Sequence, residues 1–241
     1  TRACQLMFED SASAHTLVGT YAFPTSYKDG TASSTQMTVL FKNGGQSDSD
    51  TVGDLVVKSC VATGISFAQD TGSEGGDLMV TINMMTAYQP THSSLTPSAS
   101  TDDTASAKNI RSLTNSTTLA SNSLMLYSWE LALSRSVERI SYKDTTNFDP
   151  YGYAMTGAME ASGSLSAKMD AETYDLIASF HANTGALNIQ ESSGFTVSVP
   201  LVAINEAAID SGGPHLIQTI PFIAVGNSAS TGDNVVSITA S

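Results

Sequence analysis

The sequence predicts a mainly β protein with a single helix. Apolar and β-branched residues run or alternate in short segments, and clusters of Gly, Ser, Asn, Asp and Pro separate these segments. Only one segment carries apolar residues at helical spacing. The 241 residues suffice for one elaborated β domain or for a compact domain with large insertions, and we expect a single domain over 1–241.

The first part of the chain predicts four strands. Residues 17–23 and 35–41 carry two of them, and the Gly-, Ser- and Asp-rich residues 42–54 predict a long exposed loop. Residues 55–69 and 77–88 form a predicted hairpin, because the glycines of the intervening TGSEGG tolerate the positive φ of a tight reversal. The hairpin carries three methionines that we expect to fill the core, Met79, Met84 and Met85.

The middle of the chain changes from polar to apolar. Residues 89–123 are rich in Ser, Thr, Asn and Asp, and they predict a polar insertion or an extended connection rather than a second core. A strand then starts at Ser123. Its Trp129, Leu131 and Leu133 alternate with smaller or polar residues, so these three side chains should share one buried face.

The second half predicts the helix and the last strands. Asp170 is placed to cap a helix that Asn183 or Gly185 ends. Strands are expected after it over 186–190, 194–204, 214–226 and 235–239. Pro200 and Pro221 have no N–H group to donate, so each should mark an edge, a bulge or a strand start.

Composition argues against several classes of function. The chain has 23 acidic and 10 basic residues, a formal charge of -13, and its basic residues do not cluster. Binding to DNA phosphates needs a basic patch, so specific DNA binding is not expected. Cys4 and Cys60 are interpreted as ordinary thiols. No signal segment and no run of about 18 apolar residues is visible, so membrane insertion is not expected.

The sequence carries no recognisable catalytic, cofactor-binding or metal-binding motif. GxSxG, GxxxxGK[ST] and GxGxxG are absent. The histidines stand far apart without zinc-ligand spacing: His15, His92, His181 and His215. The acidic pairs fall in polar loops where they would stay solvated: Asp48 with Asp50, and Asp102 with Asp103. We therefore predict no enzyme activity, no cofactor and no catalytic or metal residue.

With these elements in place, the second half of the chain resembles the tail tube protein family of long-tailed bacteriophages. The resemblance rests on residues 135–144 and 152–170, on the predicted helix at 173–185, and on the segments 194–210 and 215–226. Three residues match a small-residue xxGSL step of that family, Gly163, Ser164 and Leu165.

Residues 58–88 also resemble the first hairpin of that family. The resemblance implies a β-sandwich or half-barrel with one flanking α-helix. Six copies would form a ring whose strands join into one continuous inner barrel, and stacked rings would form a tube for DNA ejection into the host. The long loop 42–54 becomes a candidate for contact between rings.

The resemblance also implies a location and partners. The protein would be assembled in the host cytoplasm and would end in the virion as part of the phage tail. It would bind further copies of itself and other tail proteins such as the sheath, tape measure, terminator or baseplate, while DNA passes through the lumen without specific binding.

A receptor- or glycan-binding β-sandwich module of a virion is the alternative function. Such a module would group aromatic side chains on an exposed face, and one group could do this: Tyr142, Phe148, Tyr151 and Tyr153. The other interpretation of this group is a turn that packs its own aromatic residues. A hydrolase would need a carboxylate or histidine site that the sequence does not contain.

We also expect Gly163 to lie in a turn, where a bulky side chain would reduce assembly.

Overall fold

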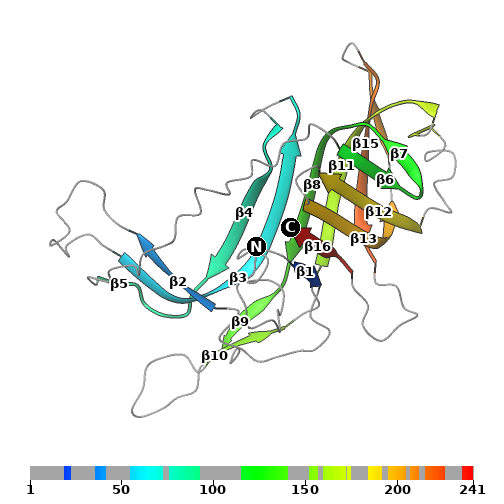
Figure 1. Cartoon of the computed structure of the whole chain (residues 1–241). Coiled ribbons are helices and arrows are strands. Elements are labelled where there is room, and N and C mark those ends of the chain that lie inside the picture. The colour runs from blue at the N-terminus through cyan, green and yellow to red at the C-terminus, as the bar shows by residue number, and fades with distance from the viewer. Residues whose placement is uncertain are drawn as a thin grey trace.

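The structure is a computed structural model, and it confirms the mainly β class. It describes residues 19–22, 36–41, 55–72, 76–92, 115–140, 152–156, 160–171, 173–174, 184–191, 195–204, 207–211, 215–225 and 235–240. These residues form one antiparallel sheet of 14 strands and a separate sheet of two strands (Figure 1). Backbone of α-helical type is confined, in the described part, to a short turn after Asp170.

The strands follow one another along the whole chain. The first eight are β1 (Gly19–Ala22), β2 (Gln36–Phe41), β3 (Leu55–Asp70), β4 (Met79–Met85), β5 (Thr91–His92), β6 (Asn115–Leu119), β7 (Asn122–Leu124) and β8 (Leu126–Ser134). The last eight are β9 (Val137–Ile140), β10 (Gly152–Met155), β11 (Glu160–Lys168), β12 (Thr184–Glu191), β13 (Phe195–Ile204), β14 (Ala208–Asp210), β15 (Ile217–Ala224) and β16 (Ser237–Ala240).

Six consecutive antiparallel neighbours form what we call the six-strand layer, in the order β4, β3, β8, β11, β15 and β14. The large sheet continues from β15 through β13 and β12 to the β6–β7 hairpin. In Figure 1 these later strands cross in front of β8, β11 and β15. One hydrophobic core joins both parts, since it includes Leu131 and Leu165 from the layer and Ile189 and Val197 from the crossing strands.

The predicted alternation in β8 is confirmed. Trp129, Leu131 and Leu133 are buried, whereas Glu130 and Ser134 on the other face are exposed. The predicted hairpin is also confirmed, because β3 pairs with β4 from Val61 to Ala68. Its turn includes Gly76 at φ +77°, the positive backbone angle that glycine tolerates best.

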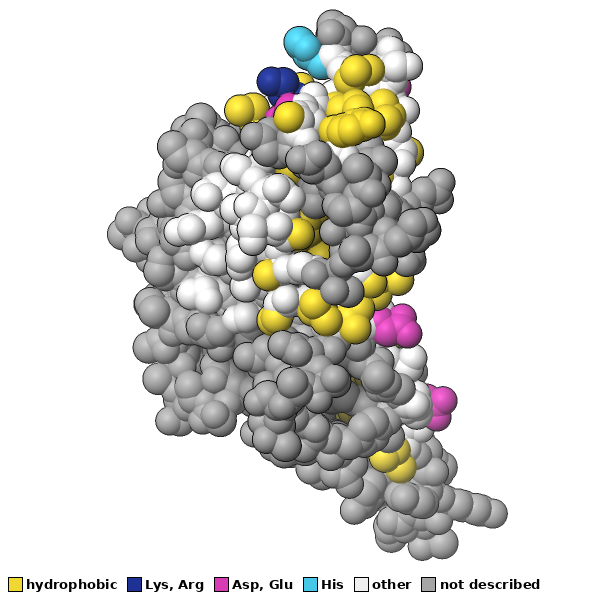
Figure 2. Space-filling view, turned by 90° about the vertical axis from the view of Figure 1, so that its right-hand side faces the viewer, with side chains coloured by type: hydrophobic (Ala, Val, Ile, Leu, Met, Phe, Trp, Pro, Cys, Tyr) yellow, Lys and Arg dark blue, Asp and Glu magenta, His cyan; other side chains and the backbone are white. Residues whose placement is uncertain are grey.

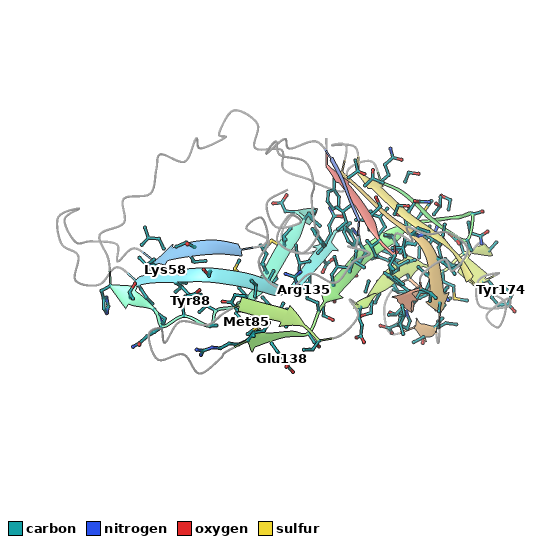
Figure 3. All side chains as sticks on the ribbon, turned by 90° about the horizontal axis from the view of Figure 1, so that it is seen from below. Lys58, Met85, Tyr88, Arg135, Glu138 and Tyr174 are labelled. Atoms are coloured by element: carbon teal, nitrogen blue, oxygen red, sulfur yellow. The ribbon has the colours of Figure 1, made fainter. Side chains whose placement is uncertain are left out.

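Strand β3 is long enough to belong to two parts of the molecule. Its 16 residues span roughly 50 Å at about 3.3 Å per residue. Residues 64–70 pair with β8 in the layer, whereas residues 55–61 pair with β2 and extend away from it as an arm with β5 (Figures 1 and 3). Arg135 lies where the arm meets the layer: its Nε donates to the Ala62 carbonyl at 2.7 Å and its backbone N–H to Thr63 at 2.9 Å.

The small β9–β10 sheet is attached to the arm by one buried tyrosine. The Tyr153 hydroxyl donates to the Ser59 carbonyl at 2.7 Å and accepts from the Ala87 N–H at 2.9 Å. Ser59 sits at φ +50° in a bulge of β3, where two β3 residues oppose one residue of β2. The bulge thus turns a backbone carbonyl toward the tyrosine.

Part of the polar tract 89–123 belongs to the core. Residues 115–119 form β6, which pairs with β12, and its Leu119 and Thr117 are fully buried. An extended connection does not describe this end of the tract, because Leu119 is buried in the core. Residues 93–114 lie outside the described residues.

A two-residue turn joins β6 to β7. Leu119 pairs directly with Asn122, and the two turn residues, Ala120 and Ser121, have φ values of +50° and +70°. Such a turn matches the strand twist but favours Asn and Gly, because a side chain at positive φ is crowded by its own backbone.

Replacing Ser121 by glycine should therefore raise the stability of the fold. Ser121 is exposed and loses little contact, so we expect a gain of about 0.5 kcal/mol after the larger chain entropy of glycine is counted. Thermal unfolding measures it. The matched control is Ser123→Gly, an exposed position inside β7, which should lower stability by a similar amount; equal signs for the two variants would contradict the turn geometry.

A helical turn follows Asp170, where the sequence predicts the start of the helix. The Asp170 carboxylate accepts from the Thr173 N–H at 3.1 Å, the Thr173 hydroxyl accepts from the Asp170 N–H at 2.7 Å, and Thr173 is buried. This reciprocal cap satisfies donors at the start of the helix. Residues 175–183 lie outside the described residues, and β12 starts at Thr184, so Gly185 cannot end a helix.

Both strand prolines interrupt pairing as predicted. Opposite Pro200, the β12–β13 register shifts between Gly185 and Leu187, which is a bulge. Pro221 lies where the neighbour of β15 changes. β13 pairs with β15 as far as Phe222, and β14 pairs with β15 from Thr219 onward. The proline therefore falls in a gap of the ladder on that side.

Candidate assembly surface

One face of the six-strand layer points away from the core. The pairing places Ala68, Glu130, Ser164 and Pro221 in one row across β3, β8, β11 and β15, and opposed residues of an antiparallel sheet share a face. None of these four side chains is buried. In contrast, the neighbouring row includes the buried Phe67, Leu131 and Phe222, which belong to the core.

We call the outward-pointing face of β3, β8, β11 and β15 the serine face. It comprises Ser66, Ala68, Asp70, Ser128, Glu130, Ala132, Ser134, Glu160, Ser162, Ser164, Ser166, Thr219, Pro221 and Ile223. Six of these 14 residues are serine and none is buried. The face is thus a broad surface of small hydroxyl side chains without a deep cleft that could enclose a substrate.

The charged residues of the serine face are acidic, with one basic residue at the end of β11. Asp70, Glu130 and Glu160 are exposed on it, and Lys168 follows at the end of β11. Acidic side chains project from the right-hand edge of Figure 2, the side that lies away from β12 and β13. Such a surface repels a polyanion and offers no cluster of cations for its phosphates.

The part of the serine face that lies on β11 could have been found in the sequence. β11 reads Glu, Ala, Ser, Gly, Ser, Leu, Ser, Ala, Lys, so its polar residues alternate with small or apolar ones. The regular alternation of such a strand indicates one polar face, but it does not show which neighbouring strands extend that face. Only the pairing with β8 and β15 does so.

Gly163 lies in the middle of this layer and not in a turn, so that prediction is wrong. It is paired with Leu131 on one side and with Phe222 on the other. A Cβ atom on Gly163 would lie 2.6 Å from the Phe222 ring and would collide with the carbonyl oxygen of Glu130. The reason for glycine is therefore close packing of a ring and a neighbouring strand, beside a shallow depression of about 470 Å³.

The layer ends in two strands that have further room for pairing. Among the described residues, β4 pairs only with β3, and β14 pairs only with β15. Exposed apolar side chains mark both edges: Met79 and Val80 on β4 are 51% and 42% exposed, and Ile209 on β14 is 50% exposed. The expectation that Met79 fills the core is therefore wrong, whereas Met84 and Met85 are partly buried.

The described titratable residues form no metal site or nucleophilic site. Within them no group of three or more His, Cys, Asp or Glu side chains could hold a metal ion. His92 and His215 are exposed on separate elements, and His15 and His181 lie outside the described residues. Burial raises the pKa of the Cys60 thiol and a backbone hydrogen bond at Val39 partly opposes this, so the thiol stays protonated at neutral pH.

The aromatic group of the alternative function is only partly described. Tyr153 is 3% exposed and both hydrogen bonds of its hydroxyl are internal, so this ring is not available to a glycan. Tyr142, Phe148 and Tyr151 lie outside the described residues.

Other predicted positions also fall outside the described part. These are the loop 42–54, Cys4 and the acidic pairs at 48 and 50 and at 102 and 103. No helix of the described residues has the length and apolar character needed to cross a bilayer.

The fold defines a broad class, a mainly β protein built on one large antiparallel sheet. Comparison of the sequence with protein-family models finds no matching family, and comparison with curated proteins finds no matching relative. The geometry of the sheet therefore carries the functional argument.

Proposed function

We propose that this protein is a structural subunit of a bacteriophage tail tube, which assembles into stacked, hexameric rings around a channel for DNA. The observation that carries the proposal is the serine face, a sheet surface of mostly small side chains whose charged residues are acidic, which lies between two strand edges open to pairing among the described residues. In the ring this face lines the channel. The flanking helix, the half-barrel shape and the continuous inner barrel belong to the same proposal.

The width of the channel follows from strand number. Six copies of β3, β8, β11 and β15 alone give 6 × 4 = 24 strands. Barrels of about 16 to 18 strands already leave an aqueous channel, and the diameter grows with strand number. A barrel of this size has room for DNA at its centre.

The charge of the subunit supports passage without binding. Six copies carry 6 × -13 = -78 formal charges. The acidic residues on the serine face repel phosphates, and most of its other side chains are small. DNA would slide along such a wall instead of adhering to it. The partners in this proposal are further copies and other tail proteins, in a particle assembled in the host cytoplasm.

Electron microscopy of the purified, concentrated full-length chain tests the proposal. We expect uniform hollow tubes or six-membered rings. A protein that stays monomeric at high concentration and binds glycans on an array would overturn it in favour of the receptor-binding module. The burial of Tyr153 and the internal hydrogen bonds of its hydroxyl argue against that module, because this aromatic ring is not available to a glycan.

A further inference from the structure

We infer that β14 is a strap that opens and closes over the buried side chain of Gln218, so that the Gln218 amide reaches water only when the strap is open. The strap comprises three residues, Ala208–Asp210, at one edge of the six-strand layer. The movement takes place within one chain and does not depend on the ring proposed above.

The Gln218 amide is buried without a partner. Gln218 is 0% exposed, and neither its Oε1 nor its Nε2 has a hydrogen-bond partner among the described residues. Its side chain points to the core, because Ile220 and Phe222 at the next alternate positions of β15 belong to the core. On β11 it is opposite the fully buried Ala167, whose methyl side chain offers no donor or acceptor. The closed state therefore carries the cost of an amide removed from water.

The strap lies on the other side of Gln218 and has little to hold it closed. It pairs with β15 at three positions, and all three of its side chains are exposed. Ile209 is directly opposite Gln218 and shares its face of the sheet, yet Ile209 remains 50% exposed. Opening of the strap would therefore expose little apolar area that water does not already reach, and such segments open at low cost.

A gap in the ladder separates the strap from the rest of the sheet. On this side of β15, β13 pairs with Phe222 to Ala224 and the strap pairs with Ile217 to Thr219. Ile220 and Pro221 lie between the two ladders and have no strand partner there among the described residues. The strap can therefore leave β15 without breaking any pair between β13 and β15.

Hydration of the amide favours the open state. A buried polar group without a partner typically shifts an equilibrium by about five- to a hundredfold toward a state in which water reaches it. The buried amide of Gln69 has no such effect, because its Oε1 accepts from Trp129 and its Nε2 donates to the Gly76 carbonyl. Gln218 thus makes opening of the strap more frequent than an apolar residue would.

Hydrogen exchange measured by mass spectrometry tests the strap, on the full-length chain diluted until no assembled particles remain. In the unaltered protein, residues 207–211 should exchange at least about a hundredfold faster than the core strand β8. Low urea concentrations should hardly change their rate, as expected for a local opening. Gln218→Met removes the amide but keeps an unbranched side chain, so it should slow the exchange of 207–211 by about tenfold. Gln218→Leu removes the same amide with a different shape and should act in the same direction.

Gln190→Met is the matched control, because it makes the same chemical change at an exposed position of β12 and should leave the exchange of 207–211 unaltered. The strap is overturned if residues 207–211 of the unaltered protein exchange as slowly as β8, or if Gln190→Met slows them equally. Unchanged exchange in the folded Gln218 variants would also overturn it, since an internal water would then satisfy the amide. Loss of folding in both Gln218 variants would overturn it as well, because the amide would then stabilise the closed state.

Discussion

Replacing Gly163 by alanine is expected to lower the free energy of unfolding by about 3 kcal/mol or more, and valine should prevent folding altogether. The added Cβ would lie 2.6 Å from the Phe222 ring and against the Glu130 carbonyl oxygen, closer than nonbonded carbon atoms approach. The Phe222 ring could rotate away only into a packed core. The Glu130 carbonyl belongs to the β8 backbone and cannot move without disturbing the ladder.

Thermal or denaturant unfolding measures this effect. The matched control is Ser162→Ala, the preceding residue of β11, whose side chain is exposed on the serine face and should change stability by less than about 0.5 kcal/mol. Ring formation should fall together with stability in the Gly163 variants. A Gly163→Ala protein as stable as the unaltered one would contradict the close packing of β8, β11 and β15.

The sequence alone predicts the strands in which apolar and polar side chains alternate. β8 and β13 were predictable because their apolar residues occupy every second position. β6 was missed, since its Asn, Ser and Thr residues resemble a loop and only burial of Thr117 and Leu119 makes it a core strand. β14 was missed because three residues are too few for a period, and its pairing with β15 arises from the fold.

The candidate surface was less predictable than the strands. Which strands of this surface lie side by side depends on pairing between residues far apart in the sequence, such as Gly64 with Ser134, 134 - 64 = 70 positions apart. Local patterns therefore reveal that β11 has a polar face but not that it continues onto β3 and β15. Gln218 shows the same limit: its position in an apolar strand gives no sign that its fully buried amide has no hydrogen-bond partner among the described residues.

Replacing Gln69 should also lower the free energy of unfolding strongly, because its side chain links two parts of the layer. Gln69 is 3% exposed; its Oε1 accepts from the Trp129 indole N–H at 2.8 Å, and its Nε2 donates to the Gly76 carbonyl at 2.8 Å. The amide thus holds the β3–β4 turn against β8. Gln69→Leu leaves both partners buried without a hydrogen bond, at a cost of about 2 to 4 kcal/mol.

Gln69→Glu should cost about 3 kcal/mol at pH 7 and much less at pH 4. An ionised carboxylate accepts from Trp129 but cannot donate to Gly76, and burial penalises its charge. The protonated acid can do both. Burial therefore raises the pKa of the introduced carboxyl above the ordinary value of about 4.3.

The sign of the pH dependence follows from proton binding. Between the ordinary pKa and the raised pKa the folded variant holds more protons than the unfolded chain, so its stability relative to the unaltered protein falls as pH rises through this window. Below about pH 4.3 the stability that the protonated carboxyl gives to the Gln69→Glu variant is fully present. Denaturant unfolding of both proteins at each pH measures the difference.

Gln69→Leu supplies the control for this experiment, because leucine does not titrate and its stability deficit should be the same at pH 4 and pH 7. If the stability deficit of Gln69→Glu were also the same at pH 4 and pH 7, the carboxyl would be reaching water. The β3–β4 turn would then open away from Trp129. The turn precedes β4, which is an edge strand of the six-strand layer among the described residues. Assembly of the Gln69→Glu protein should therefore weaken as pH rises from 4 to 7, in parallel with its stability.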